Sequence, residues 1–178
     1  MSISKYLFEL GMLKRTQRTG WWAAGVKDAE NVAEHSFRCA IIGFILAKLE
    51  GEDAEKIAFE CLIHDTAETR IGDMNKVAAS YIDSSKGEKK AFYEQMKFLP
   101  KDLAENFIKA YESKAVIAKD ADLLECALTA KEYLEQGYDT QNWIDNVRKN
   151  LKTNSAKKLL IDIEKTKSTS WWEGLKKV

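Results

Sequence analysis

The chain has 178 residues, with 28 basic and 28 acidic side chains, so its formal net charge is zero. A surface dedicated to nucleic-acid polymers usually carries a basic excess, and this balance argues against such a partner. The apolar fraction of 45% and the charged fraction of 31% are typical of a globular protein. The length fits one domain spanning residues 1–178.

Residues 1–13 are apolar but carry two charges and no small-residue cleavage site. They are too short to cross a bilayer and form a poor signal peptide. The three cysteines are widely spaced and form no CxxC motif, which is typical of a reducing compartment rather than of a disulfide framework. We therefore expect a cytoplasmic protein without membrane contact.

One proline, Pro100, and few runs of β-branched residues occur in the chain, so we predict an all-α helical bundle. Residues 15–30 lack a clear period and predict an ordered loop. Asn31 and Glu34 have the spacing of a capping box, which predicts the start of a helix. This helix is expected to end near Gly51.

A second helix is expected from Ala54, capped by Asp53, to about Glu68. Later segments keep helical periodicity up to the C-terminal region. Helices are predicted near residues 76–82, 88–98, 102–111, 114–136, 141–152 and 155–167.

Only two histidines occur in the chain, His35 and His64. A single histidine on an apolar helix face is usually a core residue, but His64 is followed by Asp65 and, one turn later, by Glu68. Positions three and four apart are neighbours on a helix, so we expect Glu68 close to both. Asp73 follows across a glycine turn and is free to fold back over it.

Asp122 shares a line at spacing four with Ala118 and Cys126. This stripe of small residues is expected to face inward, where an ionised carboxylate is unfavourable unless it is paired or binds a metal. A shared cation would satisfy this aspartate together with the groups of the earlier motifs. Asp120 points roughly 200° away around the helix, and we expect it to be exposed.

Each cysteine lies three or four residues from one of His35, His64 or Asp122. Buried cysteines are usually small core fillers. The alternative is that these thiols line the rear of a metal pocket, where they would favour a soft metal or make the protein sensitive to oxidation. The three residues are Cys39, Cys61 and Cys126.

The segments around the two histidines and the later aspartate, with NVAEHS, HDTAE and a following GD, resemble the HD-domain phosphohydrolases. They are most similar to the small 5′-deoxynucleotidase-like branch, because RTGW before the first motif and WWEGL near the end match as well. The resemblance implies a single HD domain with its metal and catalytic core at about residues 31–136 and C-terminal helices at about 137–178. It also implies a homodimer.

The resemblance further implies that one divalent cation binds four side chains and that two other carboxylates manage the attacking water and the proton transfers. Such a ligand set suits Mn²⁺, Co²⁺, Fe²⁺ or Mg²⁺. The implied metal ligands are His35, His64, Asp65 and Asp122, and the implied catalytic carboxylates are Glu68 and Asp73.

Arg18 and Trp21 are implied to contact the substrate phosphate and sugar. In the family the arginine directly precedes the tryptophan, whereas Gly20 stands there in this chain and Arg18 lies two residues earlier. Lys76 falls in the segment that corresponds to the family's substrate loop. It is placed to reach a phosphate, with a solvated surface lysine as the alternative.

The predicted function is removal of the 5′-phosphate from (deoxy)nucleoside monophosphates, with a small-molecule nucleotide as substrate. Pyrophosphohydrolysis, phosphodiester cleavage and a non-catalytic nucleotide-binding module are the alternatives. Some HD phosphodiesterases hold a second metal with additional histidines, which this chain lacks, so a one-metal monoester reaction fits better. The tryptophan pairs at 21–22 and 171–172 are expected to fill the core or an interface.

Overall fold

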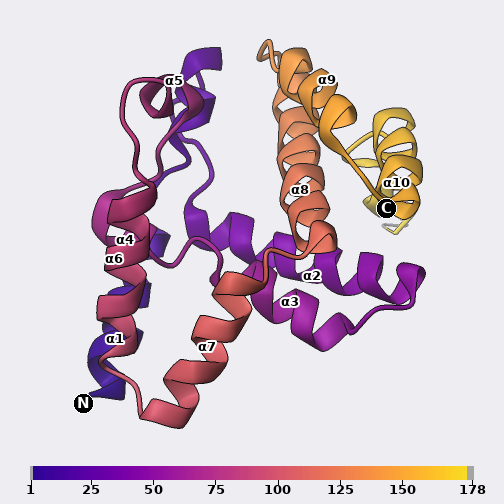
Figure 1. The fold of residues 1–178 in the computed structure, drawn as a ribbon. Helices are drawn as coiled ribbons and strands as arrows, with labels where there is room; N and C mark the ends of the chain where they lie inside the picture. Colours follow the sequence, from indigo (N-terminus) through magenta and orange to yellow (C-terminus); the bar gives the residue numbers. More distant parts are fainter. Residues whose placement is uncertain (1, 176–178) are drawn as a thin grey trace.

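The computed structural model describes residues 2–175, and within them the fold is built from ten α-helices and three 3₁₀ helices without a strand (Figure 1). The predicted all-α fold is confirmed. The α-helices are α1 (Ile3–Leu10), α2 (Val32–Glu50), α3 (Ala54–Ile63), α4 (Glu68–Ile71), α5 (Lys76–Ala79), α6 (Ser85–Met96), α7 (Lys101–Ser113), α8 (Val116–Glu135), α9 (Gln141–Asn150) and α10 (Asn154–Lys165). The 3₁₀ helices are η1 (Gly11–Lys14), η2 (Thr19–Ala24) and η3 (Ser170–Trp172).

The central helix α2 begins and ends where the sequence predicts. Asn31 Oδ1 accepts a hydrogen bond from the Glu34 backbone N–H at 3.0 Å, and Glu34 Oε2 accepts one from the Asn31 backbone N–H at 2.9 Å. This reciprocal capping box satisfies two backbone donors at the helix start. Gly51 follows the last turn with φ of 77°, a conformation that glycine adopts without steric cost.

The described part of the chain has two hydrophobic cores. The larger core packs α2, α3, η2 and the C-terminal helices α8, α9 and α10 together, whereas the smaller one joins α1, α6 and α7 around the fully buried Phe92. In Figure 1 the helices α1, α4 and α6 stand on one side, α8 to α10 stand on the other, and α2 and α3 lie beneath α8. Among the described residues, none of the helices has the length and apolar character needed to span a bilayer.

The structure differs from the predicted helix between Ala54 and Glu68. Helix α3 stops at Ile63, and four residues of turn precede α4. The reason is local competition for backbone carbonyls, because His64 Nδ1 lies 2.6 Å from the Cys61 carbonyl and the Thr66 hydroxyl donates to the Ile63 carbonyl at 3.0 Å. Residues 15–30, predicted as an ordered loop, also contain the 3₁₀ helix η2, which has no periodic pattern in the sequence.

Close packing of α2 against α3 depends on Gly43. A Cβ atom at this position would lie 2.6 Å from Cys61 Sγ and 3.3 Å from Ile57 Cγ2. Only a residue without a side chain lets the two helices approach this closely, and this approach sets the distance between His35 on α2 and the end of α3.

We predict that Gly43→Ala lowers the free energy of unfolding by about 1–3 kcal/mol, because the added methyl overpacks the buried helix contact. Chemical denaturation measures the change. Gly87→Ala, at an exposed position of α6 with open space around it, is the matched control. It should raise stability by up to about 1 kcal/mol, since alanine favours a helix. Equal effects of the two substitutions would contradict the proposed packing.

Candidate metal centre and active site

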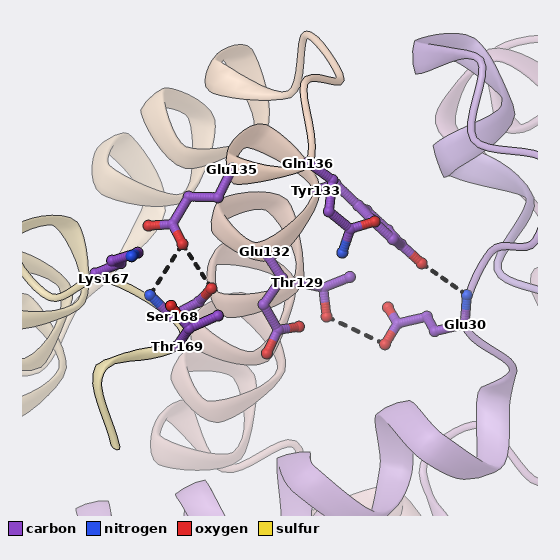
Figure 2. Close-up of a pocket in the computed structure, with 9 residues that line it drawn as sticks. All are labelled: Glu30, Thr129, Glu132, Tyr133, Glu135, Gln136, Lys167, Ser168 and Thr169. Carbon is purple, nitrogen blue, oxygen red and sulfur yellow. Dashed lines mark hydrogen bonds between the residues drawn. The ribbon is translucent and has the colours of Figure 1, made fainter. Parts of the chain in front are cut away.

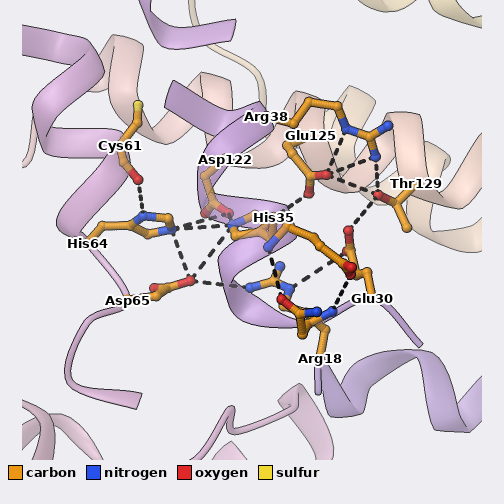
Figure 3. A network of polar contacts seen from close by, with 12 residues as sticks. Arg18, Glu30, His35, Arg38, Cys61, His64, Asp65, Asp122, Glu125 and Thr129 are labelled. Atoms are coloured by element: carbon orange, nitrogen blue, oxygen red, sulfur yellow. Dashed lines mark hydrogen bonds and ion pairs between the residues drawn. The ribbon is translucent and has the colours of Figure 1, made fainter. Parts of the chain in front are cut away.

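Both histidines and two aspartates meet where three helices converge (Figure 3). Helix α2 supplies His35, the turn after α3 supplies His64 and Asp65, and α8 supplies Asp122. His35 Nε2 lies 3.4 Å from His64 Nε2 and 3.3 Å from Asp122 Oδ1. Asp65 Oδ2 lies 3.1 Å from His64 Nε2 and 3.7 Å from His35 Nε2. The structure thus brings together all four side chains that the sequence predicts as metal ligands.

The cluster has strong internal electrostatics. Burial would lower the pKa of His35, but its contacts with Asp122 and Glu125 raise that pKa to about 9. Burial also opposes the charged form of His64, whereas Asp65 and Asp122 raise its pKa to about 9. The two imidazoles in turn hold the pKa of both aspartates below the usual range, against the effect of burial. The aspartates are therefore anionic and surround the ring nitrogens with negative charge.

The donor set fits one divalent cation. Two imidazole nitrogens and two carboxylate oxygens are borderline and hard ligands, which first-row divalent metals accept. Cys39 Sγ and ring nitrogens of His35 and His64 also lie within 4.8 Å of one another. These residues could hold a metal whose charge would take the place of protons on the imidazoles.

Arg18 reaches this site despite its altered spacing from Trp21. Its Nη1 lies 3.3 Å from Asp65 Oδ2 and 3.7 Å from Asp73 Oδ1, and its Nε lies 4.0 Å from Glu30 Oε1. Burial would lower the pKa of Arg18, but the carboxylates around it raise that pKa. The guanidinium is therefore a fixed positive charge beside the candidate metal centre.

The two predicted catalytic carboxylates differ in their surroundings. Asp73 Oδ2 accepts hydrogen bonds from the backbone N–H and the hydroxyl of Thr19, at 2.7 and 2.9 Å, and so ties the η2 loop to the turn after α4. Glu68 Oε2 is buried without a hydrogen-bond partner in the described part of the chain. Burial, together with the charges of Asp65 and Asp73, raises the pKa of Glu68 to about 9 in the absence of a cation. Of the two carboxylates, Glu68 is therefore the one with a buried oxygen that has no hydrogen-bond partner among the described residues.

A cavity of about 950 Å³ opens in front of these groups. Residues of η2 and of the segment 73–78 line one side, and α8 and α9 line the other. Lys76 stands on the first side and Lys119, which the sequence reading missed, on the second. Lys119 Nζ lies 2.6 Å from Asp122 Oδ2, and its spacing of three before this aspartate is the only signal the sequence offers.

Trp21 is mainly a packing residue at the edge of the cavity. Only 2% of it is exposed, its ring stacks on Trp143 with centroids 5.5 Å apart, and its indole N–H donates to Glu30 Oε1 at 3.0 Å. This agrees with the expectation that it fills the core. Trp22, Trp171 and Trp172 are exposed instead.

The expectation that Asp120 is exposed is wrong. This carboxylate is 1% exposed and accepts hydrogen bonds from the backbone N–H groups of Lys152 and Thr153 and from the Thr153 hydroxyl. The face of α8 opposite Asp122 is covered by the start of α10, which the angle around a single helix does not reveal. Asp120 therefore joins α8 to α10 and takes no part in the cluster.

Among the three cysteines, some fill the core and some lie beside the candidate metal centre or its cavity. Cys39 and Cys61 are buried core residues, and Cys39 also lies beside the two histidines. Cys126 is partly exposed and lines the cavity. Burial raises the pKa of the Cys126 thiol to about 12, which keeps it protonated at neutral pH.

A second, smaller cavity of about 320 Å³ lies at the C-terminal end of α8, beside residues 167–169 (Figure 2). Glu30 lines this cavity, and its Oε2 lies 3.1 Å from the Thr129 hydroxyl oxygen. Burial and the negative charge of Glu125 raise the pKa of Glu30 to about 7. The sequence reading missed this acidic region behind the candidate metal centre.

Comparisons with known proteins place the fold in a family. A sequence model of the HD domain matches residues 10–162. The chain belongs to the HD-domain family. The 5′-deoxynucleotidase HDDC2 of Dictyostelium discoideum is 31% identical over 151 residues, which are 75% of this chain and 78% of that protein. HD-domain enzymes are metal-dependent phosphohydrolases, and this chain is accordingly a hydrolase of phosphate esters.

Solved structures agree with the HD assignment. A structural-genomics crystal structure is 36% identical, with a TM-score of 0.79 over 96% of this chain and 98% of that one. The HD phosphohydrolase DatZ of cyanophage S-2L, bound to dA and one catalytic Zn²⁺ ion, is 16% identical. Its TM-score of 0.60, over 89% of this chain and 96% of that one, shows a shared fold alone.

We predict that Mn²⁺ at a hundred times its dissociation constant stabilises the HD domain by about 2.7 kcal/mol, which raises the melting temperature by about 5–10 °C. Asp122→Asn should abolish this shift, because it removes an anionic ligand. Asp120→Ala is the matched control two residues away. It should lower the melting temperature by weakening the contact with α10, but keep the Mn²⁺ shift. Melting curves that are identical in chelator and in Mn²⁺ would contradict a metal centre here.

Proposed function

We propose that this HD-domain protein is a nucleoside 5′-monophosphate phosphohydrolase that prefers deoxyribonucleotides. The observation that carries the proposal is the convergence of His35, His64, Asp65 and Asp122 beside the Arg18 guanidinium at the base of a large cavity. The HDDC2 relatives, named 5′-deoxynucleotidases, support the same substrate class. The cavity volume lies within the range that small-molecule sites occupy.

In this proposal the two histidines and two aspartates hold one divalent cation, with Mn²⁺, Co²⁺, Fe²⁺ and Mg²⁺ as candidates. When bound, such an ion supplies Lewis acidity toward a phosphate oxygen and lowers the pKa of water. Arg18 offers a planar fork of donors that suits phosphate oxygens. Lys76 and Lys119, on opposite sides of the cavity, add positive charge for the same dianion.

Glu68 and Asp73 divide the two proton transfers that hydrolysis requires. Water attacks phosphorus, the bond to the 5′-oxygen breaks, and the products are the nucleoside and inorganic phosphate. One carboxyl takes a proton from the water and the other returns one to the 5′-oxygen. The free Oε2 of Glu68 and the Oδ1 of Asp73, which faces Arg18, are the available atoms. Trp143 and the small exposed edge of Trp21 line the cavity, and we assign them to the wall that contacts the sugar.

We predict phosphate release from deoxynucleoside 5′-monophosphates in Mn²⁺, faster than from the ribonucleotides. His64→Ala and Glu68→Gln should each lower kcat/KM by about 10²-fold or more, and Arg18→Lys should raise KM. Glu105→Gln, at an exposed carboxylate of α7, is the matched control and should leave the rate unchanged.

The alternative functions give different results in the same assay. Release of pyrophosphate from a triphosphate, or cleavage of a diester, would show that the protein catalyses another HD-family reaction and not the proposed monoester hydrolysis. Nucleotide binding without phosphate release would indicate a binding module. A His64→Ala variant that turns over at the wild-type rate would contradict the proposed site.

We further propose that the protein is a cytoplasmic homodimer that pairs through the outer face of α2. Five apolar side chains at helical spacing are exposed along this face, and exposed apolar surface of this kind marks interaction sites. A twofold axis would bury the same patch of both copies against itself. The residues are Phe37, Ile41, Phe44, Ile45 and Leu49, with exposed fractions between 39% and 68%.

We predict that light scattering of the wild-type protein gives twice the mass of one chain and that Ile41→Glu gives the mass of one chain. A buried charge at a twofold contact meets its own copy and is strongly unfavourable. Ile161→Glu, at an exposed apolar position of α10, is the matched control and should remain dimeric. If only Ile161→Glu makes the protein monomeric, the dimer interface lies on α10 and not on α2.

A further inference from the structure

We propose that Glu125, held in place by Arg38, is a positioning residue that fixes which nitrogen of His35 faces the candidate metal centre. The inference rests on the proposed role of His35 as a metal ligand. Glu125 lies three residues after Asp122 on α8, and its side chain is fully buried. It does not face the cavity in front of the metal centre and has no contact with the space where substrate would bind.

The geometry divides the His35 ring into two sides (Figure 3). Nδ1 is in short contact with Glu125 Oε2, and Nε2 faces Asp122 and Asp65. A carboxylate only accepts hydrogen bonds, so the proton of a neutral imidazole must be on Nδ1. The lone pair is then on Nε2, which is the tautomer that a ligand to a cation in this cluster needs.

The other oxygen of Glu125 explains why a buried carboxylate is tolerated here. Oε1 accepts hydrogen bonds from Arg38 Nε and Nη2, at 3.0 and 2.9 Å, and from the Thr129 hydroxyl at 3.0 Å. A buried carboxylate without such partners would be strongly unfavourable. Because Oε1 is fully used by these donors, Oε2 remains for His35 alone.

Arg38 is itself anchored at the rim of the second cavity. Its Nη1 and Nη2 donate to the two carboxylate oxygens of Glu132, at 2.7 and 3.2 Å, and the Glu132 side chain is 40% exposed. Glu132 and Thr129 both line that cavity (Figure 2). A chain of hydrogen bonds therefore runs from the surface through Arg38 and Glu125 to the ring of His35.

The two histidines are oriented by different acceptors. His64 Nδ1 lies 2.6 Å from the backbone carbonyl of Cys61, a neutral acceptor that no substitution removes. His35 has an anionic acceptor, which makes its ring the more basic ligand of the two. Substitution of Glu125 should therefore affect one ligand of the pair and leave the other in place.

The test uses Mn²⁺ binding, measured by calorimetry on the full-length protein, as a readout that is independent of activity. Glu125→Gln keeps the shape of the side chain but cannot accept from His35 and from Arg38 with the same amide. We expect it to weaken Mn²⁺ binding by about 10–100-fold, and Arg38→Met to weaken it in the same direction. Glu135→Gln, on the same helix but bonded to Lys131 and Ser168, is the matched control and should bind Mn²⁺ like the wild type.

A second measurement uses only the wild-type protein and so does not depend on whether a variant folds. Nitrogen-15 NMR of the Zn²⁺-loaded wild-type protein should show a protonated Nδ1 and a metal-shifted Nε2 for His35, and the assignment is simple because the chain has two histidines. A metal-shifted Nδ1, or a wild-type Mn²⁺ affinity in a folded Glu125→Gln variant, would overturn the positioning role alone. A wild-type protein that binds neither Mn²⁺ nor Zn²⁺ would overturn the proposed metal centre as well.

Discussion

The structure depends on one electrostatic constraint, the convergence of two imidazoles and two carboxylates on a buried point between three helices. The four side chains come from three separate segments. His35 lies on α2, Asp122 lies on α8, and the other two lie in the turn after α3. Close approach of α2 and α3 at Gly43 is therefore a requirement of the chemistry as well as of packing.

Two polar layers hold this cluster from opposite sides. In front, Arg18 bridges Asp65 and Asp73 at the base of the large cavity. Behind it, Arg38 and Thr129 satisfy the carboxylate that contacts His35. Each layer places an arginine next to buried carboxylates, which offsets part of their negative charge. The side chains of the candidate site are thus held in place by the protein's own contacts.

Local chemistry made much of the fold and the candidate ligands predictable. The capping box at Asn31, the two histidines and the adjacent Asp65 are signals within a few residues of each other. Asp120 was misjudged because the helix that covers it lies over thirty residues further along the chain. Glu125 was missed because a glutamate on a helix is usually a surface residue, and its partner Arg38 lies 87 residues away in sequence. Contacts at such separations have no local signature.

Two aspartates of α8 connect the candidate metal centre to the C-terminal helices. Asp122 faces the histidines, and Asp120, on the opposite side of the same helix, accepts hydrogen bonds from Lys152 and Thr153, which directly precede α10. The seating of the segment before α10 against Asp120 therefore helps to hold the orientation of the helix that carries Asp122. A polar contact remote from the cavity thus contributes to the geometry of the candidate metal centre.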